Sequence, residues 1–279
     1  MKKKFSVAII DSGVFPHKDL TEKRKQIIVF KDFVNHKKNP YDDSGHGTAV
    51  AGIIAGNGEN EGLASFVDVV GIKVLDYKDT GSANKLLKGL KWAIDNSNTW
   101  NIKVFNISIG VQTNEKQVNE MEKLCEQAYQ KGILIVSAVG NNPGYDVEYF
   151  PASSKYVLAV GSVGYNEQNQ MTGIENYSLE WDKNGKSCPD VYTIGSNILT
   201  LQSEVTYKGN FNENIYQADQ YAIVSGTSFS AAIVTGILCN LINENPEYTN
   251  EEIIQKVLKT KEKVYSDKLK LKIPVASME

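Results

Sequence analysis

Residues 5–14 read FSVAIIDSGV, an apolar and β-branched run that stops at Asp11 and turns at Ser12 and Gly13. Such a run predicts a strand that is buried on both faces. Similar runs recur at 26–30, 67–75, 102–109, 132–139 and 156–163. Between them, helices are predicted by apolar residues spaced by three and four, with charges on the opposite face, at 84–96 and 115–131. This alternation predicts an α/β fold in three layers, with a mostly parallel central sheet and helices on both faces.

The composition restricts the class of protein before any motif is considered. The chain has 279 residues, of which 41% are hydrophobic, so residues 1–279 are expected to form one domain around a large core. A formal net charge of −3 gives no electrostatic basis for binding nucleic acid. No segment reaches the length of a transmembrane helix, and we therefore expect no contact with a membrane.

The amino terminus and the cysteines predict the compartment. The start MKKKFSVAII opens with basic residues, but only six apolar residues precede Asp11, too few for a signal peptide. No propeptide fits before Asp11 either. Cys125, Cys188 and Cys239 form no CxxC pair, which argues against a disulfide framework and against a zinc site. We therefore expect a cytoplasmic protein.

A histidine stands between two glycines in YDDSGHGTAVAG, residues 41–52. If a helix follows the DDSG turn, His46 lies near its amino end, at the carboxyl edge of the sheet where α/β proteins form their sites. Asp11 ends the first predicted strand, and its carboxylate would accept a hydrogen bond from the ring of His46. Each residue alone also has an ordinary interpretation. His46 could be a polar surface residue, and Asp11 could belong to a common Asp-Ser-Gly turn at the end of a strand.

A serine stands at a second predicted helix start. The segment VSGTSFSAAIVTGILCNLI, residues 224–242, places Ser228 near the amino end of a long apolar helix. The helix dipole favours developing negative charge at that end, although a serine there is often only a cap. The order Asp, His, Ser is more specific than any of the three alone.

Five short motifs support this order: DSG at 11–13, HGT at 46–48, NISIG at 106–110, AVGN at 138–141 and GTS at 226–228. Together they resemble the subtilisin-like serine peptidases. The resemblance implies a subtilisin-like fold and a serine endopeptidase that forms an acyl-enzyme. In it, Ser228 attacks the peptide carbonyl, His46 transfers the proton, and Asp11 orients the imidazole. Asn141 matches the asparagine that stabilises the oxyanion together with the Ser228 backbone N–H.

The resemblance also implies where a substrate binds. A peptide or protein substrate would add as an extended strand between two backbone segments, and one of its side chains would enter a pocket walled by residues 108–110 and 138–140. Tyr149 would lie at the floor of this pocket. The strand-pairing residues are Gly81, Ser82 and Ala83 on one side and Ser108, Ile109 and Gly110 on the other; the further pocket residues are Ala138, Val139 and Gly140.

Calcium is the one metal whose binding the resemblance to this family suggests. Secreted relatives often bind calcium at a loop that corresponds to GNGENEGLAS, residues 56–65, but this loop is short here. Asp19 matches a calcium ligand of the family. Because calcium takes about six to eight oxygen ligands, we expect no complete site, no essential calcium and no other cofactor or metal.

Two other classes of function stay open at this point. A catalytically silent scaffold would bind peptides without cutting them, although the intact set Asp11, His46, Ser228 and Asn141 argues against it. A nucleotide-binding α/β domain would need a GxGxxG or Walker loop after the first strand, and the sequence has neither there.

The biological role follows from the expected compartment. A cytoplasmic protease would be harmful unless it were selective, so we expect a processing enzyme with a narrow recognition sequence, for example one that removes a leader peptide. If Met1 is the native start, the enzyme should fold and act without autocatalytic activation.

Overall fold

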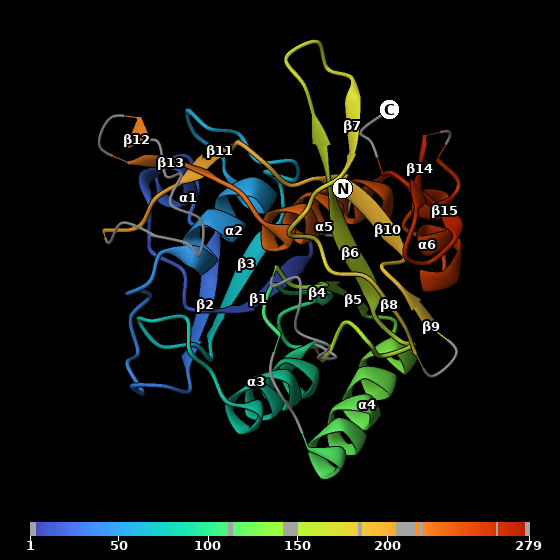
Figure 1. Ribbon diagram of the computed structural model, residues 1–279. Coiled ribbons are helices and arrows are strands. Elements are labelled where there is room, and N and C mark those ends of the chain that lie inside the picture. The colour runs from blue at the N-terminus through green and yellow to red at the C-terminus, as the bar shows by residue number, and fades with distance from the viewer. Residues whose placement is uncertain are drawn as a thin grey trace.

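The computed structural model describes residues 4–110, 114–141, 150–183, 186–204, 216–217, 220–260 and 262–276. A sheet of eight strands forms the centre of this part of the chain (Figure 1). Seven strands are parallel and lie in the order β2 (Ile27–Asp32), β3 (Asp68–Lys73), β1 (Ser6–Asp11), β4 (Ile102–Ile107), β5 (Leu134–Ala138), β6 (Leu158–Tyr165) and β10 (Val191–Ile194). The eighth strand, β7 (Met171–Ile174), pairs antiparallel with β6.

The central strands are mainly apolar because both faces of the sheet are covered. In β1, Val7 and Ile9 pack in one hydrophobic core, whereas Ala8 and Ile10 pack in a second core on the opposite face. Because side chains alternate along a strand, Asp11 falls on the same face as Ile9. The strand therefore delivers the Asp11 carboxylate to the side of the first core.

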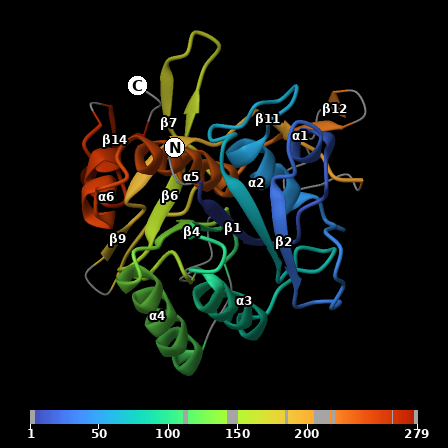
Figure 2. The ribbon, with the colours of Figure 1, turned by 180° about the vertical axis from the view of Figure 1, so that it is seen from behind.

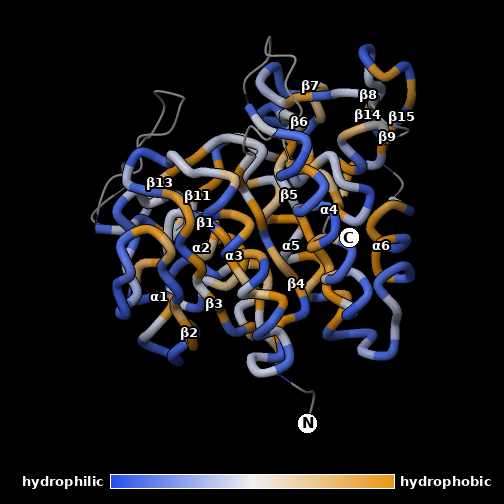
Figure 3. Tube along the Cα trace, turned by 90° about the horizontal axis from the view of Figure 1, so that it is seen from below, coloured by the Kyte–Doolittle hydropathy of each residue, from blue (hydrophilic) through white to orange (hydrophobic). Residues whose placement is uncertain are grey.

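Helices α2 (His46–Ala55), α5 (Thr227–Glu244) and α6 (Asn250–Leu258) cover that face, and α3 (Ala83–Asn96) and α4 (Glu115–Gln130) cover the other (Figures 1 and 2). Every residue of α2 is buried, so this helix is apolar all round rather than amphipathic. Figure 3 shows the same layering by hydropathy, with hydrophobic segments inside and hydrophilic ones at the periphery. These observations confirm the three-layer α/β fold predicted from the sequence.

The strand order explains where a site can form. After β1 the chain builds β2 and β3 on one side of it, and then crosses to build β4 and β5 on the other side. In open α/β sheets, ligands bind at the carboxyl edge where the strand order reverses in this way. The carboxyl end of β1, which is Asp11, lies at this point.

The remaining elements are short and lie around this frame: helix α1 (Lys18–Thr21), a sheet of β11 (Ile198–Leu201), β13 (Tyr221–Val224) and β12 (Tyr216–Gln217), and the hairpins β8 (Trp181–Lys183) with β9 (Lys186–Cys188) and β14 (Lys263–Ser266) with β15 (Leu271–Pro274). Among the helices that the structure describes, none is both long and apolar enough to span a bilayer.

Candidate active site

Asp11 and His46 form a buried hydrogen-bonded pair. Asp11 is the last residue of β1 and His46 the first residue of α2. Nδ1 of His46 lies 2.7 Å from Oδ1 of Asp11, and the two side chains are 7% and 0% exposed. A carboxylate only accepts hydrogen bonds, so Nδ1 carries the proton and Nε2 of the neutral ring is left with its lone pair. The pair therefore presents a base at Nε2.

A network centred on Asp42 holds the start of α2 in place. Its Oδ1 accepts hydrogen bonds from the Ser12 hydroxyl and from the backbone N–H groups of Ser44 and Gly45, at 2.9, 3.2 and 2.9 Å. Its Oδ2 accepts from the backbone N–H and the hydroxyl of Thr48, at 2.9 and 2.6 Å. Asp42 thus satisfies otherwise unpaired N–H groups of the first helical turn and ties them to the turn after Asp11.

Two glycines allow the helix to approach the strand end. Gly45 has a φ of +98°, which a residue with a side chain rarely adopts. A Cβ at Gly47 would lie 2.1 Å from the carbonyl oxygen of Gly13 and 3.1 Å from Cβ of Asp11. The two glycines therefore allow the start of α2 to lie directly against the turn after Asp11.

Ser228 is the second residue of α5, and the residue after it contacts His46. The ring of the next residue, Phe229, has its centroid 5.5 Å from that of His46. The Ser228 hydroxyl donates to the backbone carbonyl of Ser108 at 3.1 Å, and the Ser108 hydroxyl donates to the Ser228 carbonyl at 3.0 Å. The structure thus brings the start of α5, the start of α2 and the end of β4 together at one edge of the sheet.

Asn141, which follows β5, is held by the residue before Ser228. Its Oδ1 accepts hydrogen bonds from the backbone N–H and the hydroxyl of Thr227, at 2.9 and 2.8 Å. A Cβ at Gly226 would lie 3.0 Å from Nδ2 of Asn141, so this amide nitrogen reaches the backbone at the start of α5. With its oxygen occupied, Asn141 has only the Nδ2 hydrogens left to offer another molecule.

The carboxylates near His46 favour its charged form. Burial lowers the pKa of His46, but the charge and hydrogen bond of Asp11, followed by the charges of Asp79 and Asp42, outweigh burial and raise the pKa to about 9. The second oxygen of Asp11, Oδ2, is buried and has no hydrogen-bond partner within the described part of the chain. Its negative charge is therefore neutralised mainly by an imidazolium at His46.

The residues predicted to pair with a substrate lie at the same edge of the sheet. Ser108, Ile109 and Gly110 follow β4, and Gly110 is exposed. Ser82 caps helix α3 by accepting from the Lys85 backbone N–H, and Gly81 precedes it.

The predicted pocket is placed only in part. Ala83 is the first residue of α3 and is buried in the second core, so its side chain is not available to a substrate. Ala138 ends β5, Val139 is buried after it, and Gly140 is half-buried with a φ of +101°. Tyr149 lies outside the described residues.

The residues around Asp19 do not fit a calcium site. Its Oδ2 accepts hydrogen bonds from the backbone N–H of Asn60 at 2.9 Å and from the Tyr221 hydroxyl at 3.1 Å. Donors on a carboxylate oxygen repel a cation, whereas calcium needs several converging oxygens. No cluster of three or more His, Cys, Asp or Glu side chains that could hold a metal occurs among the residues described.

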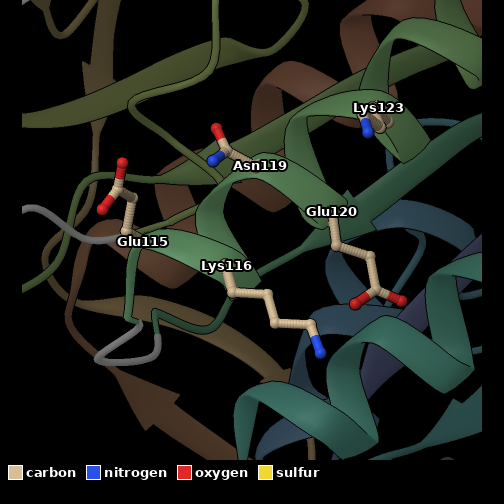
Figure 4. Close-up of a pocket in the computed structure, with 5 residues that line it drawn as sticks. All are labelled: Glu115, Lys116, Asn119, Glu120 and Lys123. Carbon is tan, nitrogen blue, oxygen red and sulfur yellow. The ribbon is translucent and has the colours of Figure 1, made fainter.

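Two hollows on the protein lie away from Asp11, His46 and Ser228. A hollow of about 910 Å³ lies where α5, α6 and the carboxyl end of β6 meet. The second lies on the outer surface of α4 (Figure 4), and its lining residues are Glu115, Lys116, Asn119, Glu120 and Lys123. Neither hollow is lined by Asp11, His46 or Ser228.

The sequence did not reveal a buried lysine beneath the site. Lys73 ends β3 and is fully buried. Its Nζ donates to Oδ1 of Asp43 and to the carbonyl oxygens of Ser12 and Leu75, at 2.5, 2.5 and 2.8 Å. Three acceptors match the three hydrogens of the ammonium group, so the lysine joins the turn after Asp11 to two neighbouring loops. A lysine inside the apolar run 67–75 is the sequence signal that marks it.

The fold and the site define a protein of the subtilisin-like class: a three-layer α/β domain with an Asp–His pair and a serine at the start of a buried helix. The chain belongs to the subtilase family, whose model matches residues 2–273.

Similar proteins agree with this membership. The chain is 30% identical over 266 residues to the serine protease AprX of Bacillus subtilis, aligning 89% of this chain with 59% of AprX. It is also 30% identical over 257 residues to the thermostable alkaline protease of Halalkalibacterium halodurans, covering 91% of this chain and 61% of that protein. The chain thus spans about three fifths of the length of these curated relatives.

Solved structures show the same fold. The S41 psychrophilic protease superposes with a TM-score of 0.73 at 24% identity, covering 92% of this chain and 82% of that chain. A cold-adapted subtilisin-like serine proteinase gives a TM-score of 0.73 at 22% identity, covering 99% of this chain and 89% of that chain.

Proposed function

We propose that the protein is a serine endopeptidase in which Asp11, His46 and Ser228 act as a catalytic triad. The observation that carries the proposal is the buried 2.7 Å hydrogen bond between His46 Nδ1 and Asp11 Oδ1. This hydrogen bond leaves Nε2 of His46 as the base. The His46 ring contacts Phe229, the residue that follows Ser228.

The reaction follows from this arrangement. The Ser228 hydroxyl first turns away from the Ser108 carbonyl and toward Nε2 of His46. It then gives its proton to Nε2 while Oγ bonds to the carbonyl carbon of the scissile peptide. The C–N bond then breaks, and the imidazolium passes the proton to the leaving amine. Water then gives a proton to His46 as its oxygen bonds to the acyl carbon. The bond between that carbon and Ser228 Oγ breaks, the imidazolium returns the proton to Oγ, and the acid product leaves. Asp11 keeps the ring oriented and stabilises the imidazolium throughout.

The oxyanion is stabilised by two N–H donors. One is Nδ2 of Asn141, whose orientation is fixed by the two hydrogen bonds from Thr227 to Oδ1. The other is the backbone N–H of Ser228, in the first turn of α5, where the helix dipole favours negative charge. Donors that are aligned before the reaction need no reorganisation when the charge develops.

We further propose that the enzyme works inside the cell on a narrow set of substrates. The support is that Cys125, Cys188 and Cys239 are all buried and form no disulfide within the described part of the chain, as expected of a protein kept under reducing conditions. A peptide substrate would run as an extended strand between 81–83 and 108–110. Fractionation of cells that express the chain at its natural level tests this compartment, and recovery only from the medium would contradict it.

Hydrolysis of a mixed peptide library tests the proposed activity. The wild-type protein should cleave a defined subset of peptides, and Ser228→Ala and His46→Ala should each lose nearly all activity while keeping the fold. Ser65→Ala is the matched control, since the Ser65 hydroxyl bonds only to Glu61 among the residues described, and its backbone carbonyl, which accepts from Arg24 and Gln26, is kept in the variant. Peptide binding without cleavage by the wild-type protein would instead favour the catalytically silent scaffold.

A further inference from the structure

The carboxylates around His46 differ in how much of their hydrogen-bonding capacity is used. Asp42 is 3% exposed, and its oxygens accept five hydrogen bonds. Asp43 is paired with Lys73. Asp79 is exposed, and its carboxylate accepts one hydrogen bond within the described part of the chain, from the Ser44 hydroxyl. A carboxylate has about four acceptor positions, so Asp79 remains open to another molecule, and unlike Asp43 it is not already paired with a lysine in the described part of the chain.

Asp79 has no ion-pair partner in the part of the chain that the structure describes. It takes part in none of the ion pairs found among the described residues. The neighbouring Lys78 instead places its ammonium 5.3 Å from the centroid of the Tyr77 ring. Desolvation by the surrounding protein, helped by the charges of Asp11 and Asp42, raises the pKa of Asp79 against the opposing effects of His46 and Ser44. The Asp79 side chain is thus accessible and partly desolvated, and its ion-pair partners are lacking among the described residues.

The backbone fixes Asp79 beside the proposed site. Its φ is +55°, a conformation that aspartate tolerates, and its N–H donates to the Asp76 carbonyl at 3.1 Å. Its hydrogen-bond partner Ser44 lies two residues before His46, and Asp79 itself lies two residues before the proposed substrate-pairing segment 81–83. A peptide that pairs with this segment and reaches Ser228 must pass this carboxylate.

We propose that Asp79 selects substrates that carry a lysine or arginine close to the scissile bond, on its amino-terminal side, by pairing with the positive side chain at the surface next to His46. This inference rests on the proposed function, because it assumes that a peptide lies across Ser228 and 81–83. A charge pair at such a partly exposed site should favour the basic peptide by about fivefold or more in kcat/KM, and high salt should reduce the preference.

The test compares matched peptides that differ only in lysine or methionine at each position before the scissile bond. Wild-type protein should prefer lysine at one position, Asp79→Asn should lose that preference, and Asp79→Lys should prefer glutamate there. Asp95→Asn is the matched control, because Asp95 is an exposed carboxylate on α3 whose ion pair, with Lys91, lies one turn away on the same helix. It should retain the preference for lysine.

Binding to the Ser228→Ala protein separates this inference from the proposed activity. Tighter binding of the lysine peptide, lost in Ser228→Ala/Asp79→Asn, supports the role of Asp79 even if the wild-type protein cuts nothing. Cleavage by the wild-type protein without any preference for a basic residue overturns the inference and leaves the proposed activity intact. A preference that persists in Asp79→Asn, or disappears equally in Asp95→Asn, also overturns it.

Discussion

At the scale of single residues, the site depends on charges that act on His46. Asp11 is hydrogen-bonded to it, whereas Asp42 and Asp79 act through space, and all three favour the imidazolium. The proposed mechanism needs the neutral ring. The same carboxylates that orient and stabilise the ring therefore also determine the pH range in which the protein can work.

The pH profile of kcat/KM should reflect this balance. Because the neutral imidazole is the active form, activity should rise with pH through a midpoint above 6.5 and near 9, the pKa of His46. Asp79→Asn removes a negative charge that favours the imidazolium, so its midpoint should lie at lower pH. A steady-state profile measured with a neutral peptide checks both statements, and an unchanged midpoint in Asp79→Asn would contradict the second.

Asn141→Ala should lower kcat much more than it changes KM, since Nδ2 would meet the oxyanion rather than the ground-state carbonyl. Loss of one such donor lowers kcat by about 100- to 1000-fold, a magnitude that comes from subtilisin itself, a member of the same family. Thr227→Val should give a partial loss, because the backbone N–H still holds Oδ1 of Asn141. Equal kcat for Asn141→Ala and wild type would remove this residue from the mechanism.

At the scale of elements, the contact between His46 and Asp11 depends on how closely α2 approaches the end of β1. The methyl group of Gly47→Ala would collide with the Gly13 carbonyl, and backbone atoms cannot move aside as a side chain can. The helix start must then shift away from Asp11, lengthening the contact with His46.

Gly47→Ala should therefore lose activity and about 1–3 kcal/mol of stability, as overpacked cores do. Gly132→Ala is the control: its φ of +74° disfavours alanine, but a Cβ there meets nothing within 4 Å. It should cost stability in urea unfolding while kcat/KM stays at the wild-type value. Full activity of folded Gly47→Ala would show that the close approach is not needed.

The local sequence was sufficient to predict the elements that carry the site. The run before Asp11, the glycines around His46 and the apolar segment after Ser228 each lie within one strand or helix, so their pattern is visible without a structure. Lys73 and Asp79 could not be predicted in this way, because their partners come from loops distant in sequence. The hairpin of β14 and β15 was not anticipated either, since its alternation is short and partly polar.

At the scale of the whole molecule, hydrogen bonds join the loop 56–62 to the rest of the domain. Asp19 bonds to Asn60 and Tyr221, and the Tyr221 hydroxyl also donates to Glu59 at 3.1 Å. These contacts connect α1, the loop and β13. The donors that these bonds place on the Asp19 carboxylate are the reason that we expect no calcium there.

The melting temperature should therefore be nearly the same with calcium and with EGTA. A site filled at 100 times its Kd would stabilise the fold by about 2.7 kcal/mol, roughly 5–10 °C for a chain of this size. Differential scanning calorimetry resolves such a shift easily. A fall of several degrees on adding EGTA would show that calcium binds in spite of the donors around Asp19.

The central claim is that Ser228 is a nucleophile activated by the His46–Asp11 pair. The most direct measurement is the reaction of the folded wild-type protein with a fluorophosphonate probe, followed by peptide mapping in a mass spectrometer. We predict one adduct per chain, on Ser228, with strongly slowed labelling in His46→Ala and none at this position in Ser228→Ala. Absence of an adduct on folded wild-type protein, or an adduct on a different serine, would contradict the proposed triad.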